Sequence, residues 1–144
     1  MASTGSAQKE TLNKFISGWK NANAEEMLAV ASDDYTQQTL PFSLGHDVRP
    51  KQVAEVMLPK LYSILENYEL KIHQVVHDVE NQKAAVYAIS KADTPFGFPW
   101  LNEFSAFITF NNAGDKVVNV QEMVDTEFFQ KFFPAYQSFL SQNK

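Results

Sequence analysis

From Asn67 to Val124, apolar and polar residues alternate with a period of two in successive segments. This alternation predicts four strands, because side chains at every second position of a strand share one face. The expected strands cover residues 70–77, 84–92, 100–110 and 116–124. Asp78–Gln82 and Asn111–Gly114 supply turns, the latter a strong hairpin signal. The second half of the chain therefore predicts a meander of strands.

Helical periodicity is found on both sides of this meander. A first helix is expected from Gln8 to about residue 21, and a short second one is expected after Asn23, which suits an N-cap. A third helix starts at Pro50, and Pro59 should kink or split it. The residues expected to face inward from this helix are Val53, Val56, Met57, Leu61, Ile64 and Leu65.

The last helix is expected to follow Asp125, a plausible N-cap. Its apolar stripe consists of Phe128, Phe129, Phe132, Phe133, Tyr136 and Leu140, which suits core, pocket lid or dimer seam. The order of elements is helices, then strands, then a final helix. This order predicts an α+β fold with helices on the concave face of one curved antiparallel sheet. We expect residues 1–6 to be a disordered tail and residues 7–144 to form one domain.

Composition excludes several classes of function. The chain has no cysteine, which rules out disulfides, thiolate metal sites and cysteine nucleophiles. Its net charge of −5 and its 12 Lys and Arg, which form no basic stripe, argue against a nucleic-acid partner. The absence of a secretory pattern and of long apolar runs predicts a cytoplasmic protein without a membrane partner. An aromatic content of 13% suits a ring-lined cavity, an aromatic core or a dimer face.

Glu122 is the most informative charged residue, because strand parity places it on the same face as Val118, Val120 and Val124. An acid on an apolar face is either at a sheet edge, reaching solvent or a lysine, or at the back of an apolar cavity. In a cavity, desolvation raises the pKa of the carboxyl and suits it to general acid or base catalysis.

On the preceding strand, Trp100, Asn102 and Phe104 share one face. If that face lines a pocket, the two rings are walls, and Asn102 either hydrogen-bonds a substrate carbonyl or orients Glu122. Glu103 then lies on the outer face, where a salt bridge or a dimer contact is expected.

Three further features of the sequence bear on the position and chemistry of a site. Asp34 either binds a substrate hydroxyl or orients a base, or it simply ends a helix. The loop of residues 93–99 places Phe96 and Phe98 around Gly97, which suits the mouth of a pocket. The histidines lack metal-ligand spacing, so we expect no metal site.

Several segments of the sequence resemble those of a known superfamily. The run Phe15–Leu28 resembles the first helix pair of nuclear-transport-factor-2-like proteins, and Asp34–Pro41 resembles the lip that follows it. Ala92–Thr94 with Pro99–Phe104, then Gly114–Val118 and Gln121–Thr126, are similar to the SnoaL-like proteins of fungal secondary-metabolite clusters. The resemblance covers nearly the whole chain.

The resemblance implies a cone-shaped pocket, usually in a homodimer, and cofactor-free chemistry on polyketide, meroterpenoid or alkaloid intermediates. Carried over by position, the pocket residues are Gln38, Trp100, Asn102, Phe104 and Glu122. The chain departs from relatives that place His or Arg in the lip, where it has Gln37 and Gln38. It also has Trp100 and Phe104 where some relatives place Tyr, so a pocket more apolar than theirs is expected.

The leading expectation is therefore a cofactor-independent isomerase or cyclase for a hydrophobic polycyclic intermediate. In it Glu122 moves a proton, and Asn102, Gln38 and Asp34 hold polar groups. Trp100, Phe104, Phe96 and Phe98 fix the shape of the substrate. The alternatives are a non-catalytic carrier of a lipophilic metabolite and a dehydratase or hydrolase on the same fold.

Overall fold

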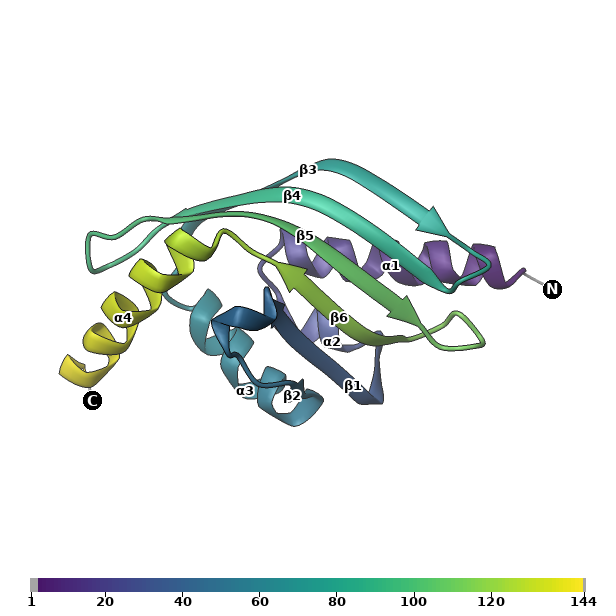
Figure 1. Ribbon diagram of the computed structural model, residues 1–144, viewed down its shortest axis with the longest axis horizontal. Helices are drawn as coiled ribbons and strands as arrows, with labels where there is room; N and C mark the ends of the chain where they lie inside the picture. Colours follow the sequence, from purple (N-terminus) through teal and green to yellow (C-terminus); the bar gives the residue numbers. More distant parts are fainter. Residues whose placement is uncertain (1–2, 144) are drawn as a thin grey trace.

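The computed structural model describes residues 3–143 and contains a sheet flanked by helices (Figure 1). In chain order the elements are α1 (Thr4–Lys20), α2 (Ala24–Leu28), β1 (Ala31–Leu40), a short 3-10 helix (Phe42–Leu44), β2 (Arg49–Pro50), α3 (Lys51–Tyr62), β3 (Glu66–Asp78), β4 (Lys83–Asp93), β5 (Trp100–Phe110), β6 (Val117–Met123) and α4 (Thr126–Gln142). The strands lie side by side in the order β2-β1-β6-β5-β4-β3.

The four strands expected from the alternation correspond to β3–β6, and their neighbouring pairs are antiparallel. The expectation of a wholly antiparallel sheet is wrong at one pair, because β1 runs parallel to β6. The sequence signal for β1 was weak, since residues 32–39 are mostly polar and resemble a helix end followed by a loop. Parity also shifts near the start of β6, where an irregularity makes Val117 rather than Val118 the buried residue.

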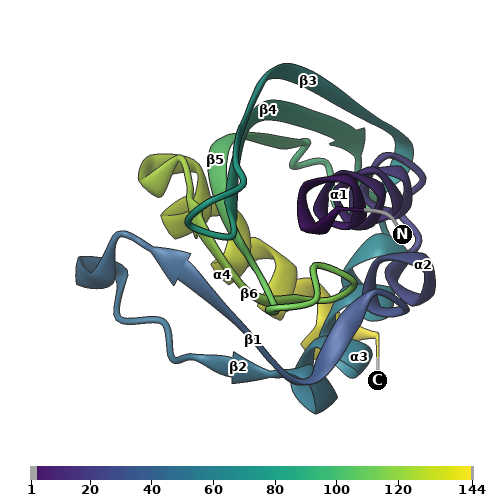
Figure 2. The same cartoon turned by 90° about the vertical axis from the view of Figure 1, so that its right-hand side faces the viewer.

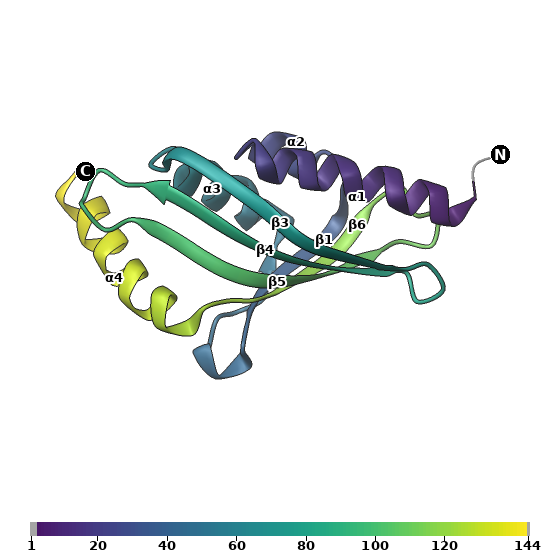
Figure 3. The same cartoon turned by 90° about the horizontal axis from the view of Figure 1, so that it is seen from above.

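The sheet curves around the helices, which confirms the α+β class expected from the order of elements. Figure 2 shows α1 within the curve formed by β3, β4 and β5, with α2 beside it. α3 packs against α2 and β1. α4 lies at the end of the sheet away from the start of α1 (Figure 3).

The second and last helices start where the capping residues in the sequence predict, whereas Pro50, expected at the first position of α3, is its N-cap. Asn23 accepts a hydrogen bond from the Glu26 amide, and Asp125 accepts one from the Phe128 amide, as expected for N-caps. The disordered tail expected for residues 1–6 is wrong from Ser3 onward, because Ser3 caps α1 and Thr4 begins it. Residues 1 and 2 lie outside the described part of the chain. No helix within residues 3–143 is long and apolar enough to cross a membrane.

α3 differs from its expected form in two ways. It continues through Pro59 and ends at Tyr62, so the proline does not split it. Its inward face is also rotated, since Ala54 is buried whereas Val53 and Val56 are exposed. A small residue at position 54 lets the helix approach its neighbours closely, which a Val-centred face would prevent.

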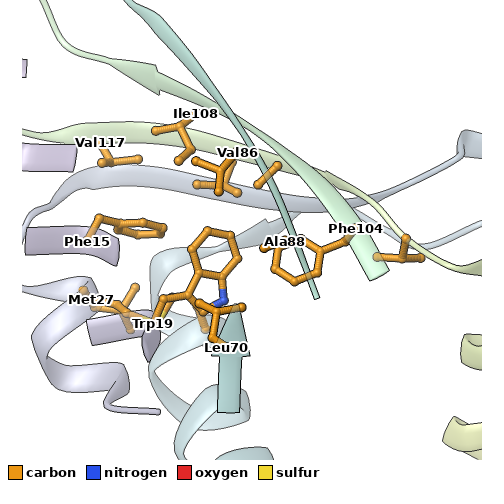
Figure 4. Close-up of a cluster of buried hydrophobic side chains, with 14 of the residues drawn as sticks. Phe15, Trp19, Met27, Leu70, Val86, Ala88, Phe104, Ile108 and Val117 are labelled. Carbon is orange, nitrogen blue, oxygen red and sulfur yellow. The ribbon is translucent and has the colours of Figure 1, made fainter. Parts of the chain in front are cut away.

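The core joins α1 and α2 to the concave face of the sheet. Figure 4 shows Phe15, Trp19 and Met27 opposite Val86, Ala88, Phe104 and Ile108 from the strands. The ring centroids of Trp19 and Phe104 lie 5.1 Å apart. Gly18 makes this packing possible, because a Cβ there would lie 2.6 Å from the backbone nitrogen of Met27. The helix pair is thus fixed against the sheet and defines one wall of the space beside it.

Candidate functional site

A cavity of about 480 Å³ lies between the concave face of the sheet, α3 and α4. Its apolar walls come from all of these layers, and include Trp19, Leu58, Trp100, Phe104, Phe129 and Phe133. Volumes of this size are typical of small-molecule sites. The stripe of α4 turns out to serve both core and pocket, since Phe132 is fully buried whereas Phe129 and Phe133 line the cavity.

Glu122 supplies the only carboxyl group among the described residues that line this cavity. It lies on β6, between β1 and β5 in the sheet, so the alternative of an edge position is wrong. Its Cα pairs with that of Thr39 on one side and that of Ala106 on the other. The side chain is partly exposed because it points into the cavity.

The surroundings of Glu122 change its acidity. Burial raises the pKa of its carboxyl from 4.5 to about 7, although the nearby positive charge of Arg49 acts in the opposite direction. We find no hydrogen bond from another described residue to this carboxyl, contrary to the expectation of a polar neighbour within reach. Both protonation states are therefore populated near neutral pH, and the oxygens are available to a bound molecule.

The β5 wall has the orientation that parity predicted. Trp100, Asn102 and Phe104 are all buried and line the cavity, and the Trp100 Nε1 donates to the Ser90 hydroxyl at 2.8 Å. Asn102 is 3% exposed, and its Oδ1 has no hydrogen-bond partner within residues 3–143. It therefore does not orient Glu122 directly. A buried acceptor without a partner is costly, which suits Asn102 to accept a hydrogen bond from a ligand.

Sequence reasoning missed the polar side chains that β1 and β2 bring to the cavity. Tyr35, Gln37 and Thr39 alternate along β1 and line the cavity, with the Tyr35 hydroxyl donating to Gln37 Oε1 at 3.3 Å. Arg49 on β2 lines it as well and donates to the Thr39 hydroxyl at 3.3 Å. Recognising residues 31–40 as a strand would have placed positions 35, 37 and 39 on one face.

Two more tyrosines, Tyr62 and Tyr68, also line the cavity. Burial, followed by the charge of Glu122, raises the pKa of the Tyr35 and Tyr68 hydroxyls well above the ordinary value. These phenols consequently stay protonated and are hydrogen-bond donors. The expectation that Tyr, His and Arg partners are missing from the pocket is wrong, because His46 and Arg49 line it beside these tyrosines.

Four expected substrate-binding residues lie elsewhere. Gln38 points away from the cavity, as the parity of β1 requires, and its Nε2 reaches the His46 carbonyl at 3.5 Å. Asp34 is exposed and accepts a hydrogen bond from Ser32 at 2.6 Å. Phe96 and Phe98 pack on α4, with ring centroids 5.6 and 5.8 Å from that of Phe132. The loop of residues 93–99 therefore supports α4 rather than forming a mouth.

Glu103 lies on the outer face of the sheet, as expected, where it is exposed and accepts a hydrogen bond from the Tyr87 hydroxyl. His73 is also exposed. His77 instead faces α1, where it contacts Gln8 through a hydrogen bond of 2.7 Å, because an irregularity in β3 between Ile72 and Gln74 shifts the parity. Within the described part of the chain, no three His, Cys, Asp or Glu side chains lie close enough together to hold a metal ion.

Two fungal relatives match this sequence over nearly its whole length. A Cryptosporiopsis protein named monooxygenase dmxR10 is 45% identical over 141 residues, covering 97% of this chain and 94% of the relative. An ergochrome gene cluster protein of Claviceps purpurea is 34% identical and covers 96% of this chain and 90% of its own length. No family model matches the sequence.

Solved structures share the fold at much lower identity. The BvnE pinacolase from Penicillium brevicompactum superposes with a TM-score of 0.84 at 18% identity, over 96% of both chains. A nuclear-transport-factor-2-like protein of unknown function from Burkholderia pseudomallei superposes with a TM-score of 0.69 at 12% identity, over 86% of this chain and 95% of that one. Likeness at this level of identity concerns the fold and not the chemistry.

Proposed function

This chain belongs to the SnoaL-like group of nuclear-transport-factor-2-like proteins, and we propose that it is a proton-transfer enzyme of fungal secondary metabolism. We propose further that it isomerises or cyclises an apolar polycyclic intermediate without a cofactor. The observation that carries the proposal is a single carboxyl group, Glu122, in an aromatic cavity. A pKa of about 7 suits that carboxyl to accept and return a proton at neutral pH.

The other side chains that line the cavity have separate roles, according to their positions. Trp100 and Phe104 contact the rings of the substrate, and Asn102 accepts a hydrogen bond from one of its hydroxyls. The hydroxyl of Tyr68 donates to a carbonyl oxygen on which negative charge develops, and that of Tyr35 joins it by turning from Gln37 to the substrate. Glu122 removes a proton from the carbon next to that carbonyl, and the protonated carboxyl returns it to another atom, which completes an isomerisation or follows ring closure.

A second candidate is favoured by the names of the relatives. The Cryptosporiopsis relative is named a monooxygenase. An enolate formed at a ring CH2 group reacts with molecular oxygen to give a hydroperoxide, and loss of water from it leaves a carbonyl, so that one oxygen atom enters the substrate and the other leaves as water. The same deprotonation by Glu122 therefore also begins an oxygenation. Conversion of a pathway intermediate under argon supports isomerisation or cyclisation, whereas a strict need for oxygen, with matching uptake at an electrode, supports oxygenation.

The alternative of a non-catalytic carrier has less support from the lining of the cavity. Tyr35, Tyr62, Tyr68 and Arg49 line the cavity and give it more polar groups than shelter of a lipophilic molecule requires.

A general probe tests Glu122 without knowledge of the natural substrate. 5-Nitrobenzisoxazole is a flat apolar molecule that opens to a coloured phenolate when a base removes its ring proton. We expect Glu122→Gln to slow this reaction by roughly 10²–10⁴-fold, because the amide keeps the shape but cannot accept the proton. Glu103→Gln on the outer face is the matched control and should retain the wild-type rate. Equal rates for wild type and Glu122→Gln refute the assignment of Glu122 as the base.

A further inference from the structure

Arg49 is a cation of the cavity lining whose bonding capacity is largely unused. It is half-buried on β2, where its Cα pairs with that of Gln37, another lining residue. Its one side-chain hydrogen bond within residues 3–143 is to the neutral hydroxyl of Thr39, at 3.3 Å. The ion pairs of the described chain, Lys14–Glu10 and Lys131–Glu127, lie on exposed helix faces and do not involve it.

The guanidinium of Arg49 has more donors than its one hydrogen bond uses. The group carries five N–H donors in a planar fork that fits two oxygens of one anion. Removing a charge from water without giving it a partner costs free energy, so such groups are normally paired. Glu122 is near enough for the two charges to influence each other, but no salt bridge joins them. Arg49 therefore presents unpaired donors to the cavity.

We propose that Arg49 binds an anionic oxygen group at one end of an otherwise apolar aromatic substrate. The group is a carboxylate or the ionised hydroxyl of an acidic enol, both of which offer charged oxygens to the fork. Lys60 also lines the cavity but is exposed to solvent at the last turn of α3, where water competes for its charge. The proposal rests on the proposed function only in treating this cavity as the substrate site.

The anion also affects the chemistry. The positive charge of Arg49 lowers the pKa of Glu122 against the larger effect of burial. An anion paired with Arg49 cancels that influence and increases the proton affinity of Glu122. A bound substrate therefore makes Glu122 a stronger base than it is in the empty cavity. Because this coupling is reciprocal, protonation of Glu122 tightens anion binding.

Binding of paired probes tests the proposal independently of turnover. Trp19 and Trp100 line the cavity, so their fluorescence reports occupancy, with calorimetry as a second readout. The probes are 2-naphthoate against 2-naphthamide for a carboxylate, and 2-hydroxy-1,4-naphthoquinone against its methyl ether for an acidic enol. Wild type should bind at least one anion more tightly than its neutral partner, by about 10–100-fold, as expected of a charge-assisted hydrogen-bonded pair.

Arg49→Gln should abolish this preference while the affinity for the neutral partner stays within about threefold, since the aromatic walls are unchanged. Lys71→Gln, exposed on β3, changes the net charge equally outside the cavity and should keep the preference. If the preference is found with the naphthoate pair, the bound group is a carboxylate. If it is found with the naphthoquinone pair, the group is an enolate.

Equal preference in wild type and Arg49→Gln overturns the proposal, as does a wild type that binds the neutral partners as well as the anions. If Arg49→Gln binds none of the probes, Arg49→Lys decides, because it keeps the charge: a retained preference supports the proposal, and a lost preference with neutral binding intact refutes it. Failure of the base assignment would instead appear as unchanged turnover in Glu122→Gln. The two hypotheses are therefore separable.

Discussion

Glu122 should destabilise the folded protein at alkaline pH, and Glu122→Gln should remove that cost. The pKa of the carboxyl is 4.5 when exposed and about 7 in the fold. Below pH 4.5 the group is protonated in both states and has no effect. As the pH rises towards 7, the unfolded chain releases its proton first, so wild type loses stability over this window.

The magnitude follows from the difference between the two pKa values. One pKa unit corresponds to about 1.4 kcal/mol, so the ionised carboxyl costs the fold about 3 kcal/mol above pH 7. At pH 8 the variant should unfold roughly 6–12 °C above wild type in a chain of this size, and at pH 4 the two should coincide. Thermal unfolding followed by circular dichroism measures this difference.

The matched control is Glu69→Gln, an exposed carboxyl on β3, which should follow the pH dependence of wild type. If wild type and Glu122→Gln have parallel stability curves from pH 4 to pH 8, the carboxyl is not desolvated in the fold. The reasoning that makes it a neutral-pH base then fails.

Turnover of 5-nitrobenzisoxazole by wild type should rise as the pH increases through about 7, because only ionised Glu122 accepts the proton; a flat profile between pH 5 and 9 would contradict this. Phe132→Ala should lower the free energy of unfolding by about 3–5 kcal/mol in urea titrations, since this fully buried ring joins α4 to the loop of residues 93–99. Asp125→Ala should cost about 1 kcal/mol in the same assay through loss of the α4 cap, while Gln130→Ala, exposed on the same helix, is the nearby control. We also propose that the outer face, with Leu101, Phe107 and Met123 exposed, forms a homodimer, so light scattering should find a dimer that Phe107→Glu dissociates.

The parts of the fold with regular hydrophobic alternation were predictable from sequence. Strands β3–β6, the hairpin at Asn111–Gly114 and the caps at Asn23 and Asp125 all follow from local patterns. Parity also placed Trp100, Asn102, Phe104 and Glu122 correctly relative to the cavity, because each lies on a strand whose register is fixed by buried neighbours. Their catalytic and binding roles stay predictions.

The residues that sequence reasoning missed lie where local patterns carry little information. β1 is largely polar, and its pairing with β6 joins residues about eighty positions apart, so no short-range signal revealed it. Gln38 was predicted only by position, from the resemblance, and the parity that corrects this assignment is visible only once residues 31–40 are known to be a strand. Arg49 follows an irregular loop and belongs to a strand of two residues, which no periodicity detects.

The parallel pairing of β1 with β6 also has a consequence for how the protein is made. Thr39 and Glu122 become neighbours only when two distant segments meet, and closing such a long loop is entropically slow. On the ribosome, α1, α2 and β1 emerge long before β6, and they wait for a partner strand that is still being synthesised. A chain interrupted before β6 therefore has β1 with Tyr35 but lacks Glu122 on the neighbouring strand, and the cavity cannot be completed until β6 has been made.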